Sequence, residues 1–149
     1  MKTFRLRLRG GERERGSLSL EAVMLFPALI MVLLLVVAFG RVTSSHNAVD
    51  TAARNAARAA SLERNGGAAS SAGQATANRV LGQQGLRCNS TSVSISTGGF
   101  SARIGERAST TVTVTCVVNL SDIALPGLPG AKTLTGSFTS PIDSYRQRG

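Results

Sequence analysis

A run of 19 residues without a charged side chain, from Ala22 to Gly40, is the feature that most limits the fold of this chain. As an α-helix rising 1.5 Å per residue, the run would measure roughly 28 Å, close to the roughly 30 Å hydrocarbon core of a bilayer. We therefore interpret it as a single membrane span. The alternative is a cleaved secretory signal, but its apolar part usually has about 7 to 15 residues and ends at a small-x-small site. The run here is longer and leads on without a convincing site of that kind.

The charges that flank this run predict its orientation. Residues 1–16 contain six basic and two acidic residues, a net charge of +4 out of +9 for the whole chain. A basic segment before a span resists translocation, so we expect the N-terminus in the cytoplasm and the part after Gly40 outside, although Arg41 is a mild counter-signal.

Nucleic-acid binding is disfavoured, because the part after the span has one Tyr, no Trp and no arginines interleaved with aromatic residues.

The helix is predicted to continue beyond the membrane. Residues 48–62 are rich in Ala, and neither Gly nor Pro occurs from Arg41 to Arg64. One helix from Ser19 to Glu63 is expected, with a bend at Pro27. Its outer half has a stripe of small and apolar residues that would let another surface approach closely: Val42, Val49, Ala52, Ala53, Ala56, Ala60 and Leu62.

The remainder of the chain predicts a second helix and then a sheet. Residues 65–74 are interpreted as a flexible turn and residues 75–85 as a short helix ended by Gly85. Strands are expected at 91–96 and 100–104, paired as a hairpin, then at 109–120 and 133–140, with a Pro-Gly loop before the last strand and an irregular tail after it. In the third strand Val112, Val114, Cys116, Val118 and Leu120 share one face, and in the last Leu134, Gly136 and Phe138 point inward. The predicted fold class is α+β: a long N-terminal transmembrane helix continues into an external helix packed on a small antiparallel sheet.

The two cysteines, Cys88 and Cys116, both lie in the predicted external part. In an oxidising compartment they favour one disulfide, which would contribute about 3 to 4 kcal/mol in the chain-entropy model. The alternative is a pair of free buried thiols.

The N-terminal motifs resemble a known family. A basic leader ends in Gly16 and is followed by Ser17, by Glu21 four residues later and by the apolar helix, a pattern similar to a type IV prepilin-type signal. Pro27 inside the span, "FGR" at its exit and "NAVDTAARNAARAA" after it make residues 13–62 similar to TadE-like pseudopilins of the tight-adherence (Tad) pilus system.

This resemblance implies specific roles and partners. A membrane prepilin peptidase would cut between Gly16 and Ser17, and Glu21 would pair with the N-terminal amine of a neighbouring subunit and set the register. Other pilins or pseudopilins and the pilus-assembly ATPase and platform proteins would be partners. Ala22 replaces the Tyr of the major Tad pilins, and the external domain of about a hundred residues is far longer than theirs, so a minor pseudopilin is favoured.

The expected organisation is a cytoplasmic leader (1–16), a long helix (17–64) with its span at 22–40, and an external domain (65–149). The protein is expected to cross the cytoplasmic membrane once and to be located there, in a pilus or at the cell surface.

Catalysis, metals and cofactors are not expected. His46 is the only histidine and has no Cys or second His at ligand spacing, and no G-x-S-x-G motif occurs. The residues leave two other functions open. One is a permanently anchored envelope protein with a binding domain, in which Glu21 is merely interfacial. The other is a DNA-uptake pseudopilin that uses Arg54, Arg58, Arg64 and Arg79 on phosphates.

Overall fold

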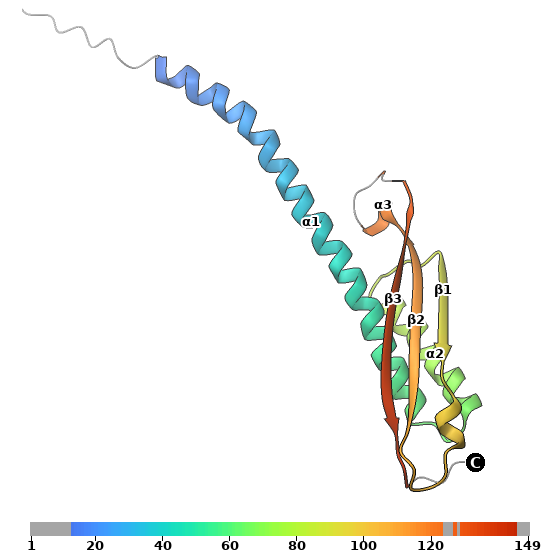
Figure 1. Cartoon of the computed structure of the whole chain (residues 1–149). Helices are drawn as coiled ribbons and strands as arrows, with labels where there is room; N and C mark the ends of the chain where they lie inside the picture. The colour runs from blue at the N-terminus through green and yellow to red at the C-terminus, as the bar shows by residue number, and fades with distance from the viewer. Residues whose placement is uncertain (1–12, 124–126, 128, 146–149) are drawn as a thin grey trace, which may run out of the picture. The chain divides into compact units, whose positions relative to one another are not determined.

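The computed structural model describes residues 13–123, 127 and 129–145, with side chains from Glu21 onward (Figure 1). The predicted leader lies outside these residues, apart from its last four positions. By its internal contacts the chain divides into two units, one ending at Val37 and one beginning at Ala38. Each unit is described separately below.

The first element is the α-helix α1, Arg13–Ser61, which confirms one long helix through the apolar run and the Ala-rich segment. It begins six residues earlier and ends two residues earlier than the sequence predicted. Pro27 lies inside it, where its ring removes one backbone donor from the helical hydrogen-bond ladder. Leu62, predicted to extend the buried stripe, is 61% exposed because the helix ends at the residue before it.

The second α-helix, α2, is Gly66–Gln83, and its start corrects the predicted turn at 65–74. Asn65 is the N-cap, and its side-chain oxygen accepts a hydrogen bond from the Ala68 N–H at 2.8 Å. This cap satisfies one of the free donors of the first turn and so allows a helix to begin in a Gly- and Ser-rich segment. The predicted end is confirmed, since Gly85 has a φ of +68° and Leu86 N–H donates to Leu81 C=O in a Schellman motif.

Three antiparallel strands form one sheet in the order β1-β2-β3. β1 is Ser90–Ile95, β2 is Ala108–Asn119 and β3 is Ala131–Ile142. The alternating Thr and Val residues of β2 behave as predicted, because Val112, Val114, Cys116 and Val118 are fully buried on one face. Leu120 is the exception in this set, since it begins the short helix α3, Leu120–Ile123, instead of continuing the strand.

The predicted hairpin between 91–96 and 100–104 is wrong. Gly98–Ser101 forms a 3-10 helix, η1, and β1 pairs directly with β2, with Ser92 opposite Thr115. Phe100 turns into the core and is 8% exposed, and a Cβ on Gly99 would collide with the Ser109 carbonyl oxygen. Burial of one aromatic ring and a close backbone approach thus outweigh the alternating pattern of residues 100–104.

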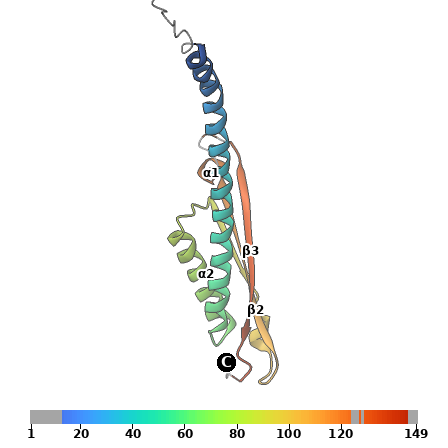
Figure 2. The same cartoon turned by 90° about the vertical axis from the view of Figure 1, so that its left-hand side faces the viewer.

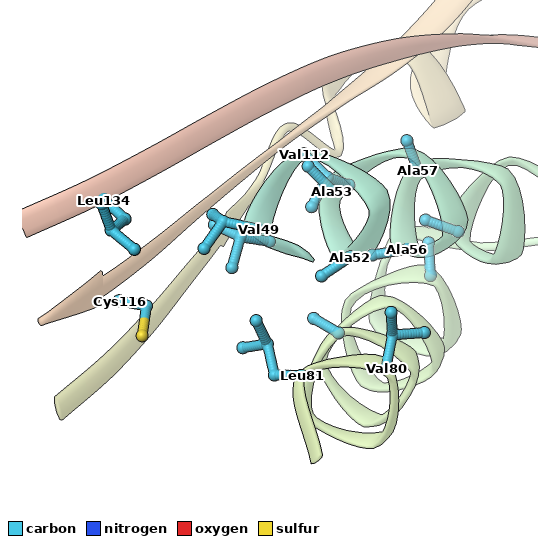
Figure 3. Close-up of a cluster of buried hydrophobic side chains, with 14 of the residues drawn as sticks. Val49, Ala52, Ala53, Ala56, Ala57, Val80, Leu81, Val112, Cys116 and Leu134 are labelled. Atoms are coloured by element: carbon cyan, nitrogen blue, oxygen red, sulfur yellow. The ribbon is translucent and has the colours of Figure 1, made fainter. Parts of the chain in front are cut away.

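The core of the second unit lies between this sheet and the helices. Figure 2 shows α2 and the outer half of α1 on the same side of the sheet. Figure 3 shows the small residues of α1 between the strands and α2, with Val49 and Ala53 near Val112 and with Ala52 and Ala56 toward α2. Five residues of the predicted stripe are nearly or fully inaccessible, and so is Ala57, which was not predicted to belong to it: the five are Val49, Ala52, Ala53, Ala56 and Ala60. Each alanine buries little apolar area. These alanines stabilise the core mainly because they let the backbones of neighbouring elements approach closely.

Two corrections concern the strand β3 and the loop before it. β3 extends the predicted strand by two residues at each end and includes Pro141 and Ile142, which had been assigned to an irregular tail. Leu134 and Gly136 are buried as predicted, but Phe138 is 40% exposed. The predicted Pro-Gly loop falls largely outside the described residues.

Candidate membrane-spanning and assembly site

The first unit presents a large apolar surface. From Val23 to Val37 the helix exposes every large apolar side chain, including Met24 at 78%, Leu25 at 54% and Phe26 at 66%. Contiguous apolar patches of more than a few hundred Å² are rare on monomeric soluble proteins and mark protein or membrane contacts. Within the described residues, α1 is the one helix long and apolar enough to cross a membrane. The described residues therefore comprise one N-terminal helix that is long and apolar enough to cross a membrane, followed by an α+β domain.

Glu21 lies at the N-terminal end of this apolar surface. Its side chain is exposed, and Ala22 begins the uncharged run directly after it. A carboxylate at this position either reaches the headgroup region or finds a positive partner, because an unpaired charge within the hydrocarbon is costly. The structure thus leaves the Glu21 carboxylate accessible to a partner.

Gly16 and Ser17 both lie in the first two turns of α1. A peptidase that cleaves extended backbone would need these turns to unwind. The first turn of a helix frays easily, because its four N–H groups have no partner within the helix. Gly16 promotes such unwinding, since glycine loses more conformational freedom in a helix than other residues do.

The two cysteines meet in the second unit. Cys88 is bonded to Cys116 with their Cα atoms 5.4 Å apart, so the disulfide prediction is confirmed. Cys116 is fully buried in the middle strand, while Cys88 lies in the connection from α2 to β1. The bond therefore fixes this connection to the centre of the sheet.

The arginines proposed for phosphate binding do not all line one groove. Arg54 and Arg58, both exposed on α1, line one groove, whereas Arg64 and Arg79 do not line it. Arg54 instead makes a cation–π contact, with its guanidinium carbon 5.6 Å from the centre of the Phe138 ring. The sequence analysis missed this contact, because the strand pattern placed Phe138 in the core.

His46 is exposed on α1. Among the residues that the structure describes, no group of three His, Cys, Asp or Glu side chains is placed to hold a metal ion.

An apolar N-terminal helix that continues into an α+β domain is typical of a membrane-associated protein, and comparison with known families indicates the class. The family model of the TadE-like proteins matches residues 16–58, which confirms the resemblance found in the sequence and indicates a component associated with the Tad pilus. The match begins at Gly16, covers the apolar run and ends within the buried Ala-rich stripe. Neither the curated proteins nor the solved structures include a match to this chain.

Proposed function

We propose that the chain is a minor pseudopilin of a Tad-type pilus. The observation that carries this proposal is the extent of the family match, which begins at the residue proposed as the cleavage site and covers the exposed apolar helix. The α+β domain that follows is far larger than the external part of a major Tad pilin, which favours a subunit that primes, anchors or tips the filament.

Insertion and processing follow from the charge distribution. The basic leader keeps the N-terminus in the cytoplasm, and the domain after Gly40 is translocated. A membrane prepilin peptidase then cleaves between Gly16 and Ser17, which removes the +4 leader and creates a new amine on Ser17. Other pseudopilins, the assembly ATPase and the platform proteins are the expected partners, and the ATPase supplies the work of extraction.

The role of Glu21 follows from the electrostatics of the membrane. Cleavage places the new amine of one subunit and the Glu21 carboxylate of its neighbour at the same apolar boundary, where charges attract more strongly than in water. Pairing neutralises both groups and fixes the axial register between subunits. The exposed position of Glu21 supports this role.

Intact mass and N-terminal sequencing of the protein purified from membranes test the proposal. We expect a mature chain that begins at Ser17 in the wild type and an unprocessed chain in Gly16→Ala. Gly40→Ala is the matched control, because a Cβ at Gly40 would meet nothing within 4 Å, and it should be processed normally. A wild-type chain that still begins near Met1 would contradict the proposal and favour a permanently anchored envelope protein. A chain that begins beyond Gly40 would show that the apolar run is a cleaved secretory signal.

A further inference from the structure

β3 is a long edge strand of the sheet. It has 12 residues, longer than most strands, and it pairs with β2 along one side, at the end of the sheet. Alternate N–H and C=O groups of an edge strand point away from the sheet and can pair with another chain. Lys132 and Pro141 are residues that discourage such pairing, but both lie near the ends of β3. Between Thr133 and Ser140 the strand has neither a charge nor a proline.

A groove of about 480 Å³ runs beside the C-terminal half of this strand and the end of α1. Figure 2 shows β3 running alongside the outer half of α1. The residues that line the groove include Arg54, Asn55, Arg58, Phe138, Ser140 and Pro141. Two of them are positively charged, and no carboxylate occurs among the described residues that line it. The groove is therefore suited to a negatively charged occupant.

The contacts inside the groove orient its polar groups. The Arg54 guanidinium carbon lies over the Phe138 ring, and this cation–π contact uses none of the arginine N–H groups as a hydrogen-bond donor, so they can still donate to a carboxylate. Ser140 Oγ donates to Ser61 Oγ at 3.0 Å, and Ser61 Oγ donates to the Arg58 carbonyl oxygen at 2.9 Å. These bonds join the last turn of α1 to β3, so the floor of the groove is preorganised.

The spacing of the two arginines matches that of a strand. Arg54 and Arg58 are four residues apart on one helix face, a rise of about 6 Å. Side chains at positions i and i+2 of an extended strand are separated by about 6.8 Å and lie on the same face. An extended segment with the pattern acid-x-acid, running beside β3, would therefore place one carboxylate near each guanidinium.

We propose that the edge of β3 and this groove bind an extended acidic segment of a partner protein by strand addition. Backbone hydrogen bonds to β3 would provide affinity, and carboxylates on Arg54 and Arg58 would provide selectivity. A second copy is a poor occupant, because pairing two β3 edges would bring like charges together. The sequence has one acid-x-acid triplet, Glu12-Arg13-Glu14. Its middle residue is an arginine and another arginine follows it, so this segment of a second copy would not be net acidic.

The first experiment measures peptide binding by the full chain in a non-ionic detergent. The probe is a fluorescein-labelled decapeptide of alternating Glu and Val, followed by fluorescence anisotropy, with an alternating Lys and Val peptide as the control. We expect the acidic peptide to bind and the basic one to fail. The double variant Arg54→Glu, Arg58→Glu should weaken binding of the acidic peptide by about tenfold or more, because both charge-assisted contacts are lost. Arg64→Glu, Arg79→Glu has the same net charge and should bind like the wild type.

The second measurement separates strand addition from simple charge attraction. Two forms of the acidic peptide, N-methylated on alternate residues, keep its charge but block the backbone donors of one edge each. We expect one form to lose binding, and we expect the bound parent peptide to slow hydrogen exchange of the β3 amides. The proposal is overturned if the acidic peptide does not bind, if both double variants weaken binding equally, or if both methylated peptides bind like the parent.

Discussion

Gly136 of β3 faces Asp50 of α1 so closely that a Cβ on the glycine would lie 3.0 Å from both the Asp50 Cα and its backbone nitrogen. The nearest atom, Asp50 Oδ1 at 2.7 Å, ends a side chain and can turn away, but the other two belong to the helix backbone, which cannot move aside in that way. The small-residue stripe of α1 and this glycine thus act together, because both remove bulk where the helix lies on the sheet. The approach of α1 to the sheet is set here more by the absence of side chains than by their attraction.

Gly136→Ala should destabilise the external domain by about 1 to 3 kcal/mol, the usual range for overpacking. Thermal unfolding of the purified protein in detergent, followed by circular dichroism, measures this as a lower melting temperature. Gly82→Ala on α2 is the matched control, because a Cβ there would meet nothing within 4 Å. Alanine is the better helix former, so the control should be neutral or slightly stabilising. Equal melting temperatures for Gly136→Ala and the wild type would show that the helix can shift.

A second close approach can be relieved. A Cβ on Gly73 of α2 would lie 2.6 Å from the terminal Cδ1 of Ile95 on β1. We expect Gly73→Ala to lower stability in the wild type, because the isoleucine must leave its rotamer. Ile95→Val removes that methyl group at a cost of about 0.5 to 1.5 kcal/mol. In the Ile95→Val background, Gly73→Ala should be neutral or stabilising. A double-mutant cycle from unfolding curves measures this coupling, and additive effects of the two substitutions would contradict it.

The sequence predicted those elements in which local pattern and tertiary environment agree. In β2 the alternation of Thr with Val and Cys matches a sheet with one buried face, so the burial of Val112 and Val114 followed directly from the pattern. The Ala-rich half of α1 was also predicted correctly as a helix, because helix propensity and small-residue packing favour the same structure. The motif from Gly16 to Glu21 owes its interpretation to a family resemblance, and the family match confirms that resemblance but not the role of either residue.

The wrong predictions fall where specific contacts outweigh the local pattern, and most of these contacts are distant in sequence. Glycines near residue 66 indicate a turn when they are considered alone, but the Asn65 cap and the packing of Gly73 against Ile95 make the segment helical. Phe100 belongs to an alternating pattern, yet its burial produces a 3-10 helix. Phe138 has the inward parity of β3 but lies at the sheet edge, where Arg54 covers its ring. None of these contacts leaves a periodic signal in the sequence.

Removing the disulfide should lower stability without changing the fold. Replacing both Cys88 and Cys116 by alanine is expected to cost about 3 kcal/mol, from the greater freedom of the unfolded chain and the loss of packing around the buried Cys116. The wild type should lose a similar amount in a reducing agent. The double variant should unfold at the same temperature with and without the reductant, which provides the internal control. An unchanged melting temperature for the wild type under full reduction would show that the bond is dispensable for stability.

Glu21→Gln tests whether the charge of the carboxylate is needed for assembly. Glutamine keeps the size and hydrogen-bonding capacity of glutamate but cannot neutralise the amine of a neighbouring subunit. Leaving one member of a desolvated charge pair unpaired costs about 2 to 5 kcal/mol, so we expect at least a tenfold loss of pili. Pili recovered by shearing, compared with the processed protein in the membrane, measure assembly separately from synthesis and cleavage. Glu63→Gln, an identical substitution just beyond the end of α1, should assemble like the wild type. If Glu21→Gln is cleaved at Ser17 and pili form at the wild-type level, Glu21 is an interfacial side chain and the register must be set elsewhere on α1.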